Sequence, residues 1–362
     1  WNVFGFENKG GSTNPFLVMF DELNWAFIVA LIASFIALIF TFDAVSGEKE
    51  TKTLALTLSS PFSRGTLLAG KFASAVITVL SLIVPGMILS TLIILLSGRV
   101  ILTATFALEV AGFVVVTILM VGIMAAFGLL SSVLTRNSNV SLLIALSFWL
   151  VFVVAIPNSS LFIAKSISPI EHAEAVQNKV DRAFEDLDKN APKGSWMMNG
   201  SNPFQPQHRL RADLQTKRST VEKQIRDAYY SAMFRQFDRT RLVTIISPVS
   251  LFEYLSEAVV GGGYLRFRKA WDDMHVYQGQ FLNFFLAFDA ADKDSPHWYN
   301  PNEDVSTTRK PVAFEKMPQF MEKPMSFVER VASVLRYLII GVFYACAVFL
   351  LTYVLFVRYD VR

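Results

Sequence analysis

Residues 105–134 read TFALEVAGFVVVTILMVGIMAAFGLLSSVL, and Glu109 is the only charged residue among them. Apolar residues occupy every face that a helix formed by this stretch would present, so no face is suited to water. About 20 such residues are enough to cross the roughly 30 Å hydrocarbon core of a bilayer. The stretch therefore predicts a transmembrane helix, and it indicates a protein that is built in a membrane.

Four further stretches have the same apolar character, at 24–42, 72–97, 140–157 and 332–357. Together they predict an all-α polytopic membrane protein with five spans in this chain. The composition agrees, because only 17% of the residues are charged, whereas a soluble domain carries about 25%. The net charge of +3 is too small to favour a nucleic-acid partner.

The charged residues are distributed unevenly, and most lie between Asn158 and Arg330. This excess predicts one sizeable aqueous domain. Lys and Arg in the short loops predict the orientation, because they concentrate on the cytoplasmic side of a membrane. By this rule the cytoplasmic basic residues are Lys49, Lys52, Arg64, Lys71, Arg136, Arg358 and Arg362, and the outer ones are Lys9 and Arg99. The aqueous domain is therefore expected outside.

The resulting layout places successive segments on alternate sides of the membrane. We expect an outer segment at 1–23, a span at 24–42, a cytoplasmic loop at 43–71, three spans within 72–157, an outer helical domain at 158–330, a span at 331–357 and a cytoplasmic tail at 358–362. Because the chain starts outside without a signal peptide, we expect one more span upstream of Trp1, which gives six in the full protein.

The outer domain has helical periodicity. A helix is expected to start at Ser168-Pro169-Ile170-Glu171, with Ser as the cap and Glu three residues later. A second amphipathic run from Gln207 to Thr240 suggests that the two form an antiparallel hairpin. Two further helices are expected, one from Ser247-Pro248 to the glycines after Val260 and one over 264–288.

Motifs for chemistry are weak in this chain. Residues 65–71 read GTLLAGK, which fits the phosphate-binding pattern G-x-x-x-x-G-K, but Phe72 follows where that motif needs Ser or Thr to hold magnesium. The four histidines lack a metal-ligand spacing, and Cys346 is the only cysteine, so no intrachain disulfide is possible. We expect no enzyme activity and no metal or cofactor bound by this chain.

The cytoplasmic loop carries the most specific signal. Residues 42–71 read FDAVSGEKETKTLALTLSSPFSRGTLLAGK, and the chain ends FVRYDVR at 356–362. Both segments resemble type 2 ABC-transporter permeases, whose cytoplasmic signature runs S-G-E-K-E, then T-L, then L-S-x-P and S-R, and ends in G-K. The resemblance implies a subgroup with an enlarged periplasmic helical domain between the last two spans.

In that family the loop is the coupling helix, which docks into a separate ATPase subunit. Glu48 and Lys49 offer charges of both signs to such a partner, Leu54, Leu56 and Leu58 offer an apolar face, and Pro61 allows the return into the membrane. The residues assigned to ATPase coupling are Gly47, Glu48, Lys49, Glu50, Leu54, Pro61 and Arg64. A different interpretation is an ordinary charged loop that obeys the positive-inside rule.

Within the spans, Glu109, Pro85 and Gly86 are candidates for the translocation path. A membrane carboxylate is a functional candidate, although Glu109 lies near the outer end of its span and is equally compatible with an interfacial position. Pro85-Gly86 is expected to kink the second span, either for gating or for static packing. Gly122-x-x-x-Ala126 and Gly128-x-x-x-Ser132 favour close helix contacts.

The resemblance implies the permease subunit of an ABC exporter in the bacterial inner membrane, coupled to an ATPase subunit that binds ATP and Mg. It also implies a second permease subunit, identical or related, in the lipid bilayer. A periplasmic protein is a further candidate partner for the outer domain. The alternatives are an ATP-independent sensor or scaffold that acts through its periplasmic domain, and an intramembrane enzyme. The substrate is not readable from the sequence.

Overall fold

The computed structural model describes residues 24–59, 61–98, 100–192, 206–293 and 314–359. Every regular element in this part of the chain is a helix, which confirms the all-α class. Four helical segments are long and apolar enough to span a membrane, at Arg64–Leu96, Ala104–Leu134, Ser138–Asn158 and Phe327–Arg358, and a shorter apolar one covers Trp25–Ile39.

The first predicted span is formed by α2 (Trp25–Phe27), the π-helical turn η1 (Ile28–Ala33) and α3 (Ser34–Ile39). The side chain of Asn24 caps its start by accepting a hydrogen bond from the backbone of Phe27 at 2.9 Å. The helix ends before Phe42, earlier than the predicted boundary.

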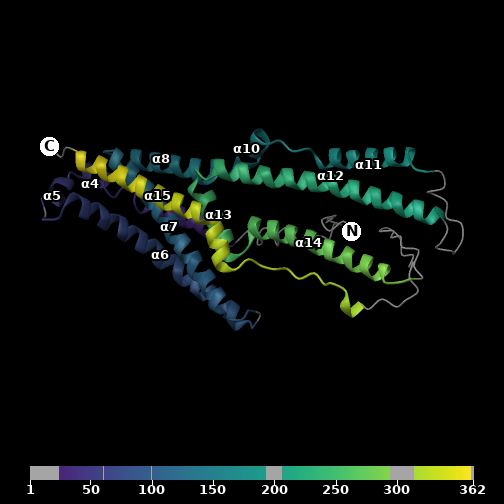
Figure 1. Cartoon of the computed structure of the whole chain (residues 1–362). Coiled ribbons are helices and arrows are strands. Elements are labelled where there is room, and N and C mark those ends of the chain that lie inside the picture. The colour runs from purple at the N-terminus through teal and green to yellow at the C-terminus, as the bar shows by residue number, and fades with distance from the viewer. Residues whose placement is uncertain (1–23, 60, 99, 193–205, 294–313, 360–362) are drawn as a thin grey trace. The chain divides into compact units, whose positions relative to one another are not determined.

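The other spans are α6 (Arg64–Leu96), α7 (Ala104–Leu134), α8 (Ser138–Trp149) with η2 (Leu150–Ala155) and α9 (Ile156–Asn158), and α15 (Phe327–Arg358) (Figure 1). Two of them begin before their apolar runs, because polar side chains supply the caps. Ser63 caps α6, and Ser326 with Glu329 forms a capping box for α15. The first residues of α6 therefore come from the segment predicted as loop.

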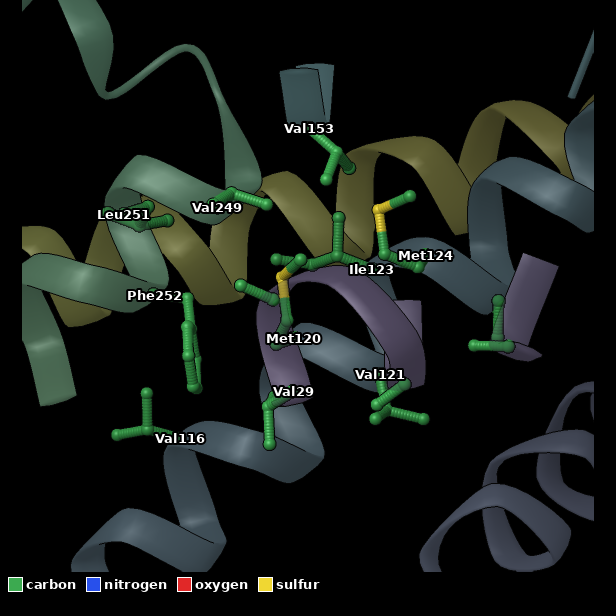
Figure 2. Close-up of a cluster of buried hydrophobic side chains, with 14 of the residues drawn as sticks. Val29, Val116, Met120, Val121, Ile123, Met124, Val153, Val249, Leu251 and Phe252 are labelled. Carbon is green, nitrogen blue, oxygen red and sulfur yellow. The ribbon is translucent and has the colours of Figure 1, made fainter. Parts of the chain in front are cut away.

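α7 is the central helix among the spans. In the most apolar 18-residue stretch of α7, 67% of the residues are buried inside the protein, whereas the share is 17% for the corresponding stretch of each of the other three long spans. It packs against α3, α6, α8 and α15, and against α13, which covers Pro248–Val260. Figure 2 shows Met120, Ile123 and Met124 of α7 among valines and Phe252 from the surrounding elements. The outer faces of α6, α8 and α15 expose large apolar side chains, as lipid-facing helices do.

α13 (Pro248–Val260) has the boundaries that the sequence predicts: Ser247 caps it, and Gly261 ends it with φ of +76°. Its location differs from the expectation, because the sequence assigned it to the outer domain. Leu251 and Phe252 are buried in the core built around α7, and Ser247 Oγ donates to Phe152 O at 2.5 Å. Residues 243–265 therefore belong to the same compact unit as the spans.

The second unit comprises residues 161–242 and 266–324. It contains most of α10 (Ser160–Ile167) and of α14 (Gly263–Ala290), α11 (Ala173–Lys189), most of α12 (Pro206–Thr244) and the short η3 (Phe314–Lys316). The helix start predicted at Ser168–Glu171 is wrong, since α11 begins at Ala173. The reason is that Glu171 binds Lys179 at 2.5 Å instead of capping, while the backbone carbonyl of Ser168 accepts from Gln236 at 2.7 Å.

α12 is the axis of this unit, and its neighbours run antiparallel to it. On one side Arg218 of α12 binds Asp188 of α11, and Arg226 of α12 donates to Gln177 of α11 at 3.1 Å. Residue numbers in α11 therefore decrease as those of their partners in α12 increase, which is the order of two antiparallel helices. This order confirms the predicted hairpin. On the other side the ring of Tyr230 contacts that of Trp271 of α14 at 4.2 Å between centroids.

Candidate functional site

The 43–71 loop folds into two short helices followed by the start of α6. α4 covers Ser46–Glu50 and α5 covers Leu54–Leu58. The turn between them places Lys52 at φ of +60°, and Thr53 donates its backbone N–H to Glu48 O at 2.9 Å. The loop is thus a compact folded element of two short helices, where the family resemblance had implied a single coupling helix.

A small apolar core holds this loop against the spans. Leu54 is 3% exposed and packs with Leu68 of α6, with Leu129 and Val133 of α7 and with Phe356 of α15. The sequence had grouped Leu54 with Leu56 as one apolar face for a partner. Two helical residues two positions apart point in nearly opposite directions, however. Leu56 is 75% exposed, so only Leu56 of these two remains accessible.

Glu48 is bound within the chain. Its Oε1 atom lies 2.6 Å from Lys71 Nζ of α6, and Lys71 Nζ also donates to Ala44 O at 2.5 Å. Oε2 of Glu48 is buried and has no hydrogen-bond partner among the described residues. The pair joins α4 to α6, and about three quarters of each side chain is shielded from solvent.

Lys49 binds the end of α7. Its Nζ atom donates to Val133 O at 2.6 Å and to Thr135 O at 2.9 Å, and it lies 4.3 Å from the ring centroid of Tyr359. The last carbonyls of a helix have no intrahelical donor and carry partial negative charge, so an ammonium group is a favourable partner there. Lys49 therefore caps α7 and contacts the residue that follows α15.

Glu50 and Arg64 bind two further helix ends. Glu50 Oε2 accepts the backbone N–H of Ser138, the first residue of α8, at 2.9 Å, and this hydrogen bond lowers the pKa of Glu50. Arg64 Nη1 donates to Val357 O at 2.8 Å and to Tyr359 O at 2.9 Å, at the end of α15. The four charged side chains thus tie the loop to α6, α7, α8 and α15.

The remaining exposed surface of the loop carries both polar and apolar side chains. We use the name apolar tip for the exposed residues Ala55, Leu56, Pro61 and Phe62, beside which Thr51, Lys52, Thr53, Ser59 and Ser63 are also exposed. Phe62 is 66% exposed, close to the value for Leu56. Leu56 and Phe62 are therefore the large apolar side chains that the described part of this loop leaves most exposed.

The family model described as ABC-2 family transporter protein matches residues 5–361, which is nearly the whole chain. The chain belongs to the ABC-2 transporter family. No curated protein matches it. The match supports the membrane-permease interpretation of the sequence, and the coupling role of the loop stays a prediction.

Lys49 gives the ABC-2 permease a titratable group at this site. Burial, and to a smaller extent the charge of Arg136, lower the pKa of Lys49 from 10.5 to about 8. The unfolded chain holds this proton more tightly, so the contribution of Lys49 to the free energy of unfolding rises with pH between about 8 and 10.5.

We predict that competitive acetylation of Lys49, followed by peptide mass spectrometry over a pH series, shows half-maximal reactivity near pH 8. Exposed Lys52 serves as the reference within the same protein. In a Tyr359→Ala, Arg136→Ala variant the midpoint of Lys49 should rise, because the charge of Arg136 and part of the burial are removed. A midpoint near 10.5 in the unaltered protein would contradict the buried position.

Glu109 is not an isolated membrane carboxylate in this permease. Its Oε1 atom lies 2.5 Å from Arg330 Nη2, and Arg330 is only 7% exposed. The guanidinium lies where Gly261 ends α13, and a Cβ at Gly261 would sit 1.7 Å from Arg330 Nη1. The pair joins α7 to α15 beside the end of α13. A role in the translocation path stays a prediction.

Pro85 and Gly86 lie inside α6, which continues as one helix through both residues. The indole of Trp25 packs closely against Gly86, since a Cβ at Gly86 would lie only 2.9 Å from the ring. The stretch Gly65–Lys71 is likewise helical, and its lysine binds Glu48, so it forms no phosphate-binding loop.

Sequence reasoning missed two residues that position the loop. Ser132 Oγ of α7 accepts the backbone N–H groups of Val45 at 2.8 Å and Ser46 at 2.9 Å, which lie at the start of α4. Gly128, one turn earlier, has no side chain to obstruct Thr41. The Gly128-x-x-x-Ser132 pattern was the available signal, and it had indicated close packing without indicating the partner.

Proposed function

We propose that this chain is the permease subunit of an ABC exporter and that a separate ATPase subunit docks on the apolar tip of the 43–71 loop. The tip would lie in the cytoplasm of a bacterial cell, and the second unit on the periplasmic side of the inner membrane. ATP and Mg would bind to the ATPase subunit. Two permease subunits, identical or related, would enclose the substrate path between them.

The proposal rests on one observation: four charged side chains of the loop are bound within the chain, whereas two of its large apolar side chains are exposed. The charged side chains of Lys49, Glu50 and Arg64 are bound to helix ends of the same chain, and Glu48 is bound to Lys71 of α6. Leu56 and Phe62 remain exposed. Interface residues that contribute most to binding are typically large and become buried on association. The accessible part of the loop therefore suits docking by apolar contact.

The same contacts supply a route for mechanical coupling. A displacement of the loop acts at once on α6 through Lys71, on α7 through Lys49, on α8 through Glu50 and on α15 through Arg64. Helices joined at their ends move as a body when one of them is displaced. Closure of two ATPase subunits would then tilt the spans together and alternate the exposure of the path.

The second unit would cap the exit, gate release or recruit a periplasmic protein. Its antiparallel helices α11, α12 and α14 offer extended surfaces of the kind that protein partners use. The substrate class stays open, because the buried side chains of α7 are apolar or carry small hydroxyl groups, and these do not discriminate among lipids, peptides and drugs.

The proposal is tested by replacing Leu56 and Phe62 with Asp in the full-length chain and by co-purifying the complex in mild detergent. Each replacement puts a charge where apolar burial is expected, so the ATPase subunit should bind more than about tenfold more weakly, a loss of roughly 1.4 kcal/mol or more. Mass spectrometry and an ATPase assay quantify the partner.

Ile101→Asp is the matched control, since Ile101 is 81% exposed in the turn between α6 and α7. This variant should retain the ATPase subunit. Undiminished binding by the Leu56→Asp, Phe62→Asp variant would place docking elsewhere. A chain that purifies with no ATPase at all would favour the sensor or scaffold alternative.

A further inference from the structure

The short helix α10 follows a span almost without interruption. Ser138–Asn158 is an apolar helical segment long enough to cross a bilayer, and Ser159 alone separates it from α10. The last carbonyls of the span are satisfied locally, since Asn158 donates to Val154 O at 2.7 Å and Ser159 Oγ to Ala155 O at 2.6 Å. The backbone carbonyls at the end of the span are therefore hydrogen-bonded before α10 begins.

Within the part of the chain that the structure describes, α10 is hydrogen-bonded to α12. Gln236 of α12 donates to the carbonyls of Ala164 at 3.2 Å and Ser168 at 2.7 Å, at the end of α10. Ile163 and Ala164 are half-buried. In contrast Leu161 is 66% exposed and Phe162 is 75% exposed.

Three of the exposed side chains of α10 share one face. Leu161, Phe162 and Lys165 lie within one helical turn of each other, because residues four apart are neighbours on a helix. Large apolar groups next to a lysine are typical of a helix that lies in the membrane interface, where the apolar groups enter the acyl boundary and the ammonium group meets lipid phosphates.

We propose that α10 is an interfacial helix whose Leu161 and Phe162 insert into the membrane leaflet at which the Ser138–Asn158 span ends. Continuity with the span identifies lipid as the occupant of this face. Leu161 is three residues beyond Asn158, so its Cα lies within about 11 Å of the end of the span. That reach matches the roughly 5–10 Å depth to which interfacial helices bury their apolar face. The helix would anchor α12, through Gln236, to the membrane surface.

The inference is tested by nitroxide depth measurement on the full-length chain in vesicles of phosphatidylcholine with a minor share of phosphatidylglycerol. Cys346 is exposed and is first replaced by Ser. A single cysteine is then placed at Phe162, or at Leu161 with Phe162 retained, and is labelled. Power saturation compares the accessibility of each label to oxygen, which concentrates in lipid, and to a nickel chelate, which stays in water.

We expect labels at 161 and 162 to be more accessible to oxygen than to the chelate. Ile77, exposed on α6, provides the lipid reference, and Glu174, exposed on α11, provides the water reference. Labels at 161 and 162 that behave like the label at 174 would overturn the inference. Labels shielded from both reagents would also overturn it, because a protein surface would then cover α10. Neither result bears on ATPase docking, so this inference and the proposed function fail independently.

Discussion

Glu48→Lys is expected to uncouple the permease from the proposed ATPase subunit while the spans still fold and insert. The substitution places a second ammonium group beside Lys71, where Glu48 now lies 2.6 Å away with much of its side chain shielded. Two like charges about 4 Å apart near a protein surface repel by roughly 4 kcal/mol before any relaxation. α4 would leave its position, and the apolar tip would move with it.

The measurement is the ATPase activity and substrate transport of the reconstituted complex, with co-purification of the ATPase subunit as a separate readout. All three should fall by more than tenfold, roughly the effect of 1.4 kcal/mol. The double exchange Glu48→Lys, Lys71→Glu re-forms an ion pair of opposite polarity and should restore most of the activity. Glu174→Lys, a charge reversal at an exposed position of α11, is the control and should have no effect.

Reversal of Glu50 has a smaller expected effect. Glu50 is exposed and serves as a cap for α8 through a single backbone hydrogen bond to Ser138. The two glutamates look equivalent in the sequence, and their surroundings distinguish them. Full transport by the Glu48→Lys variant would contradict the coupling route through α4 and α6.

Gly128→Ala is expected to destabilise the membrane unit severely. A Cβ at Gly128 would lie 1.9 Å from Thr41 Oγ1 and 2.9 Å from the backbone carbonyl oxygen of Leu38, at the crossing of α7 and the end of α3. The carbonyl is part of the backbone, so α3 and α7 would have to separate. Overpacking of a core costs about 1–3 kcal/mol and occasionally more, and the backbone contact places this substitution at the upper end of that range.

Thermal unfolding in detergent measures this effect, with Gly122→Ala as the matched control on the same helix. The nearest atom to a Cβ at Gly122 is Phe72 Cζ at 3.7 Å, an ordinary contact. Replacing Gly by Ala in a helix is otherwise favourable by up to about 1 kcal/mol. Gly122→Ala should therefore be neutral or mildly stabilising. Equal stability of the two variants would show that α3 and α7 are not in close contact at Gly128.

The segment between the last two spans is divided between the two compact units. Residues 243–265 return to the core around α7, so this segment does not form the single continuous domain that the sequence predicted. α13 packs against α7 and α15, and its end at Gly261 receives Arg330. A movement of α15 against α7 would have to move α13 as well.

The sequence by itself determined the spans, the loop between the first two and the limits of α13. These features depend on local chemistry: an apolar run must satisfy its own backbone in lipid, Ser247 and Pro248 start a helix, and Gly261 permits the left-handed turn that ends one. The same local information predicted helices at 206–244 and 263–290 closely.

Only the tertiary structure decided what the polar residues of these elements bind. Lys49 caps α7 more than eighty residues away, and Glu109 pairs with Arg330 at a separation of 221 residues. A carboxylate or an ammonium group has the same local signature whether its partner is another subunit, a lipid or a distant helix end. Folding resolves this ambiguity, because a charge that becomes shielded must find a partner among the groups that packing brings within reach.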